Sequence, residues 1–364
     1  MTVEFTGMID FVPGSEIYPT SKAGLDQRHI EHSARVHEDA GFDRVLLPFG
    51  SYTPEGMIVA THIATMTKRL AFMIAHRPGF TAPTVAARQL ATIDSLTGGR
   101  VGVHIITGGA DAEMARDGDH LTKDERYART DEYLTLLRQE WMSASPFDYQ
   151  GNHYNVTAAF AKVKPAQTPH IPIYFGGLSD VAIRVGAKHA DIYAIWGEAL
   201  DEVREVTSRI RREAAAHQRR MKFSISFRPI LGDTEEAAWK RADEFLARAR
   251  EVRIQAGLPV SGHDPANVGS KRMLKVASRG ARLDKCLWTE MTALTGSPGN
   301  STGLVGTPEQ VADALMDYYD LGVTTFLIRG FDPLSDAEDY GRSLIPLVRA
   351  MVAKRASADQ AATA

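Results

Sequence analysis

Short runs of apolar residues alternate along this chain with segments whose apolar positions recur at helical spacing. The pattern predicts eight strands, each followed by a helix, and one further helix before the last strand. The predicted strands are 5–12, 44–48, 70–75, 100–106, 171–175, 191–195, 222–231 and 324–328. The predicted helices are 28–40, 56–66, 83–96, 123–141, 179–189, 201–217, 235–252, 307–321 and 335–352. Such alternation favours a parallel sheet, and eight units within about 250 residues favour an α/β fold of the (β/α)8 barrel type over a doubly wound sheet.

Two stretches interrupt the alternation. Residues 147–164 contain a polar turn around Gly151 between short β-prone runs, which predicts a β-hairpin. Residues 256–306 are rich in Gly, Ser and Pro, and an insertion of this length predicts a lid or binding loop, with a disordered excursion as the alternative. No linker separates domains, so we expect one domain over 1–355 and a disordered tail over 356–364.

Composition and charge narrow the class of protein. The formal net charge of −3 gives no general attraction to nucleic acid or to a membrane surface. A single cysteine, Cys286, excludes an intramolecular disulfide and a cysteine-based zinc cluster. No signal-peptide pattern opens the sequence and no apolar run approaches membrane-spanning length, so we expect a cytoplasmic protein.

The segment Tyr174–Asp180 carries the most informative local pattern. An apolar strand leads into Gly176 and Gly177, and Ser179 caps the helix that follows. The free N–H groups and the dipole of a helix N-terminus attract phosphate, and glycine lets the backbone approach it closely. The alternative is an ordinary strand-to-helix turn with a serine cap.

Barrel chemistry lies at the carboxyl ends of the strands. Four predicted strand ends carry aromatic residues suited to a planar heterocycle or an apolar substrate: Tyr52, Trp196, Phe227 and Phe331. Three carry arginines suited to an anion: Arg77, Arg228 and Arg329. A structural network of Arg228 and Arg329 with Asp10, Glu198 or Asp332 is the alternative.

These strand ends contain neither a metal-ligand spacing nor a Ser-His-Asp pattern, so we expect no metal site and a bound cofactor that carries the chemistry.

Several short motifs also occur along the chain, and their order and spacing match those of a known protein family. They are Ala75–Pro78, Ala82–Gln89, Leu96–Arg100, Thr107–Gly108, Glu125–Tyr127, Tyr174–Gly177, Trp196–Glu198 and Gly306–Pro308. Through them the chain, from about residue 5 to 350, resembles the bacterial luciferase-like flavin monooxygenases, most closely the alkanesulfonate monooxygenase branch. The resemblance implies a (β/α)8 barrel with insertions. It also implies reduced FMN supplied by a separate NAD(P)H-dependent flavin reductase, use of O2, and carbon–sulfur cleavage of a small sulfonate. We expect a homodimer or homotetramer.

The resemblance also assigns cofactor-binding roles. The FMN phosphate matches the turn of Gly176, Gly177, Leu178 and Ser179, together with Tyr127. Thr107 and Gly108 match the strand end beside the flavin, and Trp196 lies in a further matching strand end. Ala75 and His76 fall where the family often has a cis peptide bond under the flavin ring.

The substrate half of the motif set departs from the family. Thr53 stands where sulfonate-cleaving relatives carry Cys, Ser226 and Arg228 stand where they carry Arg and His, and Phe331 replaces a Tyr. We therefore predict Arg228, Thr53, Arg329 and Asp10 as the catalytic residues of a flavin-dependent monooxygenase whose substrate the sequence does not name. A flavin- or deazaflavin-dependent dehydrogenase, a non-catalytic flavin-binding relative, and a cofactor-free lyase or hydrolase are the alternatives.

Overall fold

A computed structural model describes residues 2–300 and 302–363, apart from the side chains of 359–363. Its described residues group into two compact units. Unit 1 comprises 1–45, 194–209 and 222–364, and unit 2 comprises 46–193 and 210–221. Strands β2 (Arg44–Leu47) and β8 (Ile192–Trp196) each contain a boundary between the units.

The chain has the (β/α)8 barrel fold that the alternation predicts, built on eight parallel strands. The other barrel strands are β1 (Glu4–Met8), β3 (Ala71–His76), β4 (Val101–Ile105), β7 (Ile173–Gly176), β9 (Lys222–Leu231) and β13 (Val323–Ile328). Their central residues are buried, as expected for strands covered on both faces. Our description of 1–355 as a single domain stays a proposal.

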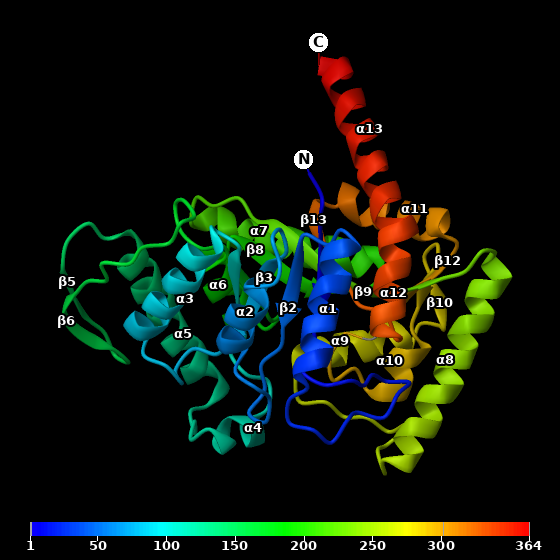
Figure 1. The fold of residues 1–364 in the computed structure, drawn as a ribbon, viewed down its shortest axis with the longest axis horizontal. Helices are drawn as coiled ribbons and strands as arrows, with labels where there is room; N and C mark the ends of the chain where they lie inside the picture. The colour runs from blue at the N-terminus through cyan, green and yellow to red at the C-terminus, as the bar shows by residue number, and fades with distance from the viewer. Residues whose placement is uncertain (1, 301, 364) are drawn as a thin grey trace. The chain divides into compact units, whose positions relative to one another are not determined.

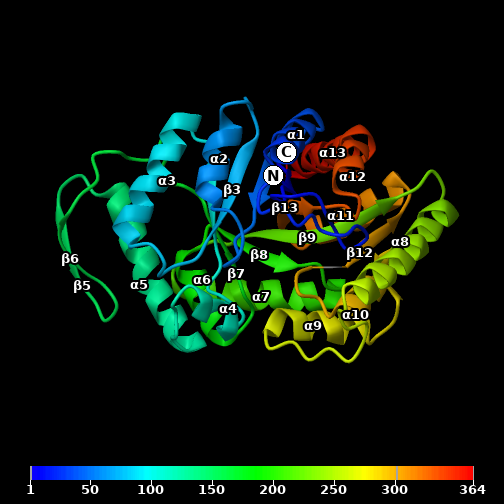
Figure 2. The ribbon, with the colours of Figure 1, turned by 60° about the horizontal axis from the view of Figure 1, so that its bottom comes forward.

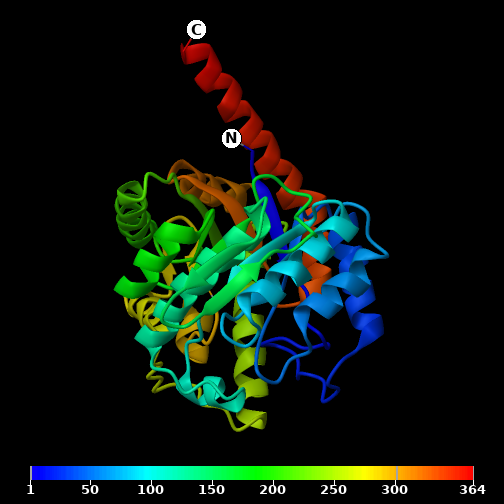
Figure 3. The same ribbon diagram turned by 90° about the vertical axis from the view of Figure 1, so that its left-hand side faces the viewer.

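In unit 2, strands β2, β3, β4 and β7 follow one another in the sheet, and the β3–β4 and β4–β7 pairs are parallel. The helices of this unit are α2 (Gly56–Ala64), α3 (Pro83–Thr97), α4 (Asp111–Arg116), α5 (Lys123–Met142) and α6 (Asp180–His189). The predicted hairpin is confirmed as β5 (Phe147–Gln150) and β6 (Asn155–Ala159), which extend past α5 (Figures 1 and 3).

Local sequence explains where these helices begin and end. Thr122 and Glu125 form a capping box at the start of α5, satisfying two backbone N–H groups that the helix leaves free. Pro83 occupies the first turn of α3, where a missing N–H costs nothing, and Gly98 ends that helix in the left-handed conformation. Helix α4 was not predicted, because six residues are too few to show a helical period.

In unit 1, β9, β13 and β1 are consecutive parallel strands, so their carboxyl ends meet at one edge of the sheet. The helices of this unit are α1 (Gln27–Asp39), α8 (Glu235–Gln255), α9 (Val268–Ala277), α10 (Glu290–Thr295), α11 (Pro308–Asp320), α12 (Pro333–Asp339), the π-helical turn η1 (Tyr340–Leu344) and α13 (Ile345–Thr363). Helix α7 (Leu200–Ala216) crosses a boundary between the units.

The 256–306 insertion is more regular than its composition suggests. It contains α9, α10 and three short strands, β10 (Arg282–Leu283), β11 (Leu287–Trp288) and β12 (Gly303–Gly306), and Figure 2 shows α9 and α10 beside α8. Strand β12 pairs with β9, so the disordered excursion considered for this stretch is not what the structure shows. Its action as a lid stays a prediction.

The last helix of unit 1 is longer than expected. Helix α13 continues to Thr363, through residues expected to form a disordered tail, as Figure 1 shows; Ala364 lies outside the described residues. None of the helices within the described part of the chain is both long and apolar enough to cross a membrane.

Candidate functional site

The turn between β7 and α6 has the shape of an anion cradle. Gly177 is exposed and has a φ of +118°, a conformation that residues with a Cβ rarely adopt. A Cβ placed there would lie 2.8 Å from the Tyr127 hydroxyl oxygen. The Tyr193 hydroxyl donates to the carbonyl oxygen of Gly177 at 2.5 Å, which fixes the turn. Ser179 caps α6 by accepting from the N–H of Ala182.

Tyr127 connects this turn to the end of β4. Its ring is buried, and burial raises the pKa of the phenol while the nearby Ser179 and Thr107 hydroxyls lower it. Thr107 is itself buried, and its hydroxyl interacts with that of Tyr127. Gly108 adopts a φ of +96° and packs against Met114 so closely that a Cβ would meet its sulfur at 2.3 Å. The predicted phosphate-side residues are therefore brought together within unit 2.

The expectation of a cis peptide bond between Ala75 and His76, at the end of β3, is wrong. The cis peptide bond found among the described residues is Thr168–Pro169, and Ala75–His76 is not cis. Both Ala75 and His76 pair regularly with β4, so the strand stays extended to its end. His76 Nε2 lies 2.6 Å from the Tyr133 hydroxyl, and burial lowers its pKa to about 4, so this imidazole is neutral near pH 7. The cofactor role of this pair stays a prediction.

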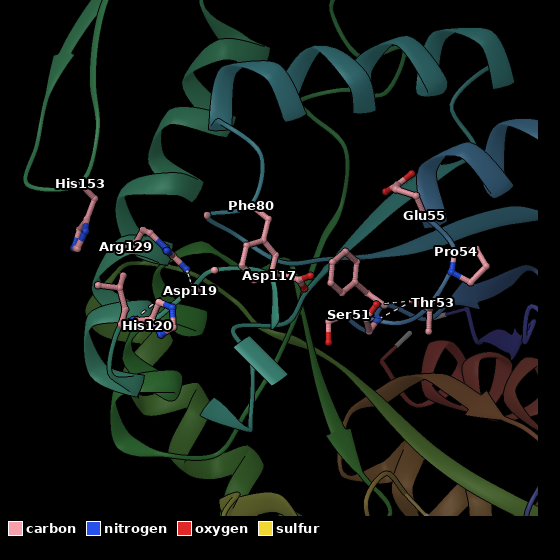
Figure 4. Close-up of a pocket in the computed structure, with 15 residues that line it drawn as sticks. Ser51, Thr53, Pro54, Glu55, Phe80, Asp117, Asp119, His120, Arg129 and His153 are labelled. Carbon is pink, nitrogen blue, oxygen red and sulfur yellow. Dashed lines mark hydrogen bonds and ion pairs between the residues drawn. The ribbon is translucent and has the colours of Figure 1, made fainter. Parts of the chain in front are cut away.

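A cavity of about 850 Å³ lies in unit 2, beyond the ends of β2 and β3 (Figure 4). This volume is within the range of small-molecule sites. One side is formed by the loop that contains Ser51 and Thr53, and the other by the Asp119–Arg129 ion pair, 2.5 Å apart, together with His120 and His153. Phe49 and Phe80, stacked with ring centroids 6.3 Å apart, supply aromatic surface between them. The cavity therefore suits an organic molecule with a planar or apolar part.

Thr53 lines this cavity, but its hydroxyl is engaged locally. It donates to the carbonyl oxygen of Gly50 and accepts from the Gly50 N–H, both at 2.9 Å. Arg77 lies behind the stacked rings, 4.8 Å from the Phe49 centroid, and pairs with Glu113 at 3.2 Å. A catalytic role for Thr53 thus stays a prediction from its position alone.

In unit 1, the two predicted catalytic arginines both have acidic partners. Arg228 forms a two-pronged pair with Glu16, at 2.7 and 2.6 Å, and also donates to the carbonyl of Gly330. Arg329 pairs with Asp10 at 2.7 Å and lies 3.6 Å from Glu16. The alternative expectation, a structural ion-pair network of Arg228 and Arg329, is therefore present. Glu16 is a partner that the sequence did not indicate.

Glu16 is the site residue that sequence reasoning missed. It lies in the irregular loop after β1, one residue beyond Ser15, and an acidic residue in such a loop gives no sequence signal of its own. Burial raises its pKa, but the Arg228 and Arg329 guanidiniums outweigh burial and lower the pKa to about 2. Burial opposes the charged form of Arg329 as well and so lowers its pKa. The carboxylates of Asp10 and Glu16 outweigh burial, and the pKa of Arg329 is raised.

The aromatic residues expected at the mouth do not all lie there. Phe227 and Phe331 are fully buried, Phe227 against Tyr318 and Phe331 under the Arg228 guanidinium, 4.2 Å from it. Phe227 lies on β9, where successive side chains alternate between the two faces of the strand, whereas Phe331 lies in the irregular segment after β13. Tyr52, by contrast, is 81% exposed.

Trp196, at the end of β8, contacts the insertion. A Cβ on Gly269 of α9 would lie 2.9 Å from its ring, so the indole packs directly against that helix. Arg272, one turn further along α9, forms a two-pronged pair with Glu198. Helix α9 is therefore fixed to the β8 strand end.

The loop before β12 reaches the middle of β9. The Asn300 amide donates to the carbonyl of Ser226 at 2.6 Å, and Thr302 holds the Asn300 side-chain oxygen at 3.0 Å. The Ser226 hydroxyl is buried and without a partner in the described part of the chain. Within the same described residues, no group of three or more His, Cys, Asp or Glu side chains could hold a metal ion.

Comparison with known proteins agrees with this architecture. The model of the luciferase-like monooxygenase family matches residues 5–325. The chain belongs to this family. By family, this luciferase-like monooxygenase is a flavin-dependent oxidoreductase.

Solved structures share the fold at low identity. A riboflavin lyase in complex with modified FMN and riboflavin is 19% identical, with a TM-score of 0.79 over 96% of this chain and 92% of that one. EDTA monooxygenase from Chelativorans sp. BNC1 is 20% identical, with a TM-score of 0.76 over 96% and 94%. A coenzyme F420-dependent tetrahydromethanopterin reductase from Methanopyrus kandleri is 17% identical, with a TM-score of 0.68 over 96% and 100%.

A phosphate-bearing flavin fits the residues of unit 2. Gly177 leaves space that a side chain would fill, the Tyr127 hydroxyl borders that space, and the α6 N-terminus faces the same turn. Gly176, Gly177, Leu178, Ser179 and Tyr127 are the residues that would hold the phosphate.

Proposed function

We propose that this luciferase-like monooxygenase binds reduced FMN, delivered by a separate NAD(P)H-dependent reductase, and uses O2 to oxidise a small organic substrate. Organosulfur compounds, with carbon–sulfur cleavage, are the substrate class we favour. The observation that carries the proposal is the Gly177 cradle beside Tyr127, which would be closed by any side chain. Reduced FMN supplies the electrons that activate oxygen.

The residues of this chain would bind the flavin and orient the substrate. The turn Gly176–Ser179 and Tyr127 would hold the phosphate. Thr107, Gly108, Ala75, His76 and Trp196 would contact the rest of the flavin. Arg228, Arg329, Asp10 and Thr53 would form the substrate side, with the arginines acting electrostatically because a guanidinium is not a base at neutral pH. A homodimer or homotetramer in the cytoplasm remains part of the proposal.

The reaction type is tested by supplying FMN, NADH and a flavin reductase with a panel of sulfones, thioethers, sulfonates and carbonyl compounds. We expect oxygen uptake above the reductase-only rate and a product that carries one atom from labelled O2. A second candidate, hydride transfer with a deazaflavin, is favoured only by the likeness to F420-dependent structures. Turnover under nitrogen with reduced deazaflavin, and none with FMN and O2, would select it instead.

We also propose that the 256–306 insertion excludes water from the bound flavin. Helix α9 is already fixed by Arg272 and Glu198, and the loop before β12 by Asn300, so the segments we expect to respond are 256–262 and 264–267, on either side of His263. Hydrogen exchange, followed with and without reduced FMN under nitrogen, is expected to slow about tenfold in these segments and not in the β5–β6 hairpin. Unchanged exchange in 256–267 on saturation with reduced FMN would remove the lid from the proposal.

A further inference from the structure

The charged strand ends of unit 1 are electrically balanced. Both terminal nitrogens of Arg228 are bound by the two oxygens of Glu16, and the face of its guanidinium is covered by Phe331. This is the geometry by which arginine binds a carboxylate ligand, and here Glu16 of the same chain occupies it.

Arg329 is balanced in the same way. Asp10 and Glu16 carry two negative charges, and Arg228 and Arg329 carry two positive ones, so the four side chains sum to zero. A further cation nearby, Arg241, is paired with Asp336 at 2.6 Å.

The other groups around the cluster add no unpaired positive charge. Arg248, which donates to the carbonyl of Ile17, is paired with Glu251 at 3.3 Å. Asp332 accepts a hydrogen bond from the Tyr18 hydroxyl at 3.1 Å and contributes a negative charge. His29 interacts with Asp10, and burial lowers its pKa, so this ring is neutral at pH 7. An anionic ligand would therefore meet carboxylates without meeting an unpaired cation, and would lose its hydration on entry.

The polar atoms left without partners are single donors. On β9 and at the end of β13, they include the Ser226 hydroxyl and the Nε groups of Arg228 and Arg329, all buried. Each can donate one hydrogen bond to an uncharged oxygen, such as that of a sulfone, sulfoxide, ketone or amide. None presents the free two-pronged fork that a sulfonate or carboxylate requires.

We infer that the substrate of this enzyme is uncharged near its reacting group, and that Glu16 sets this preference by occupying the Arg228 fork. The inference rests on the proposed function in so far as that function places the substrate at these strand ends. It makes a neutral organosulfur or carbonyl compound the substrate class, in place of a sulfonate. Glu16 acts as a specificity-determining residue, because its removal leaves a buried guanidinium open to an anion from solution.

The test compares the binding of propanesulfonate and dipropyl sulfone to the FMN-loaded protein by ligand-observed NMR titration. Glu16→Gln keeps the size of the side chain and frees the guanidinium. We expect this variant to bind propanesulfonate at least about tenfold more tightly than the wild type, with no gain for dipropyl sulfone. Glu244→Gln, which breaks an exposed pair with Lys240, is the matched control and should gain nothing.

A propanesulfonate affinity that differs less than threefold between the wild type and Glu16→Gln overturns the inference, whether both bind or neither does. An equal gain for dipropyl sulfone also overturns it, because the substitution would then have loosened the site rather than released a charge. Circular dichroism checks folding, and Asp10→Asn, which releases Arg329 instead, replaces Glu16→Gln if that variant is unfolded. FMN titration of the same samples reports separately on the proposed function.

Discussion

Replacing Gly177 by valine is expected to weaken FMN binding by about 100-fold, or about 2.7 kcal/mol. A Cβ at this position would lie 2.8 Å from the Tyr127 hydroxyl and 3.1 Å from the Ala182 Cβ, so the added atoms push Tyr127 from the turn and fill the space for the phosphate. The backbone φ of +118° adds strain for any residue with a Cβ. Quenching of flavin fluorescence on titration measures the loss.

Gly98→Val is the matched control for backbone strain. Gly98 also has a positive φ, +66°, but a Cβ there would meet nothing within 4 Å. We expect this variant to lose some stability and to keep its FMN affinity. Similar FMN affinities for Gly177→Val and the wild type would contradict the proposed phosphate site, and an equal loss in both variants would assign the effect to strain alone.

Much of this fold could be predicted from the sequence because periodicity reports burial directly. Strand β9 has the predicted bounds, 222–231, and the hairpin after α5 was recognised from its polar turn. The insertion was harder to predict. Strand β12 has only four residues, two of them glycine, and becomes a strand because it pairs with residues of β9 that are 75 positions earlier in the sequence. Such long-range pairing leaves no local pattern.

The candidate site also has a local part, which the sequence could predict, and a long-range part, which it could not. The Gly176–Ser179 turn is a local structure, so its sequence predicted its geometry, including the need for glycine at position 177. The partners of Arg228 are not local: Glu16 is 212 residues away and lies in a loop without periodicity. Sequence could therefore place the arginine at a strand end, but not show that its charge is already satisfied.

Arg228→Met is expected to destabilise the protein by about 3 kcal/mol, because it leaves Glu16 charged and partly buried with only Arg329 nearby. Arg228→Met combined with Glu16→Gln removes both charges of the pair, so we expect the double variant to be more stable than Arg228→Met alone by about 1–3 kcal/mol. Urea unfolding of the four proteins measures this coupling. Lys240→Met, at an exposed pair with Glu244, should change the free energy of unfolding by less than about 0.5 kcal/mol.

The pH dependence of this coupling has a definite sign. The folded-state pKa of Glu16 is about 2, below its ordinary value of 4.5. A lowered carboxylate pKa stabilises the folded state above the unfolded pKa, and that contribution is lost as the pH falls. The gap in unfolding free energy between the wild type and Arg228→Met should therefore be full above about pH 5 and narrow toward pH 2. A gap independent of pH over this range would mean that packing of the Arg228 stem, not its charge, provides the stability.

Measurement of turnover distinguishes two roles for Arg228, orienting the substrate and holding the loop after β1. If the guanidinium helps to orient the substrate, Arg228→Met should lower kcat more than tenfold, about 1.4 kcal/mol or more, at temperatures where it remains folded. Arg228→Lys keeps the charge but loses the fork, so it should retain folding and recover kcat only in part. A positioning role through Glu16 predicts that the double variant recovers stability without recovering kcat. If Arg228→Met instead turns over like the wild type, Arg228 is a structural residue that holds the loop after β1. Arg329, which shares Glu16 and has its own partner in Asp10, is then the arginine to test at the substrate.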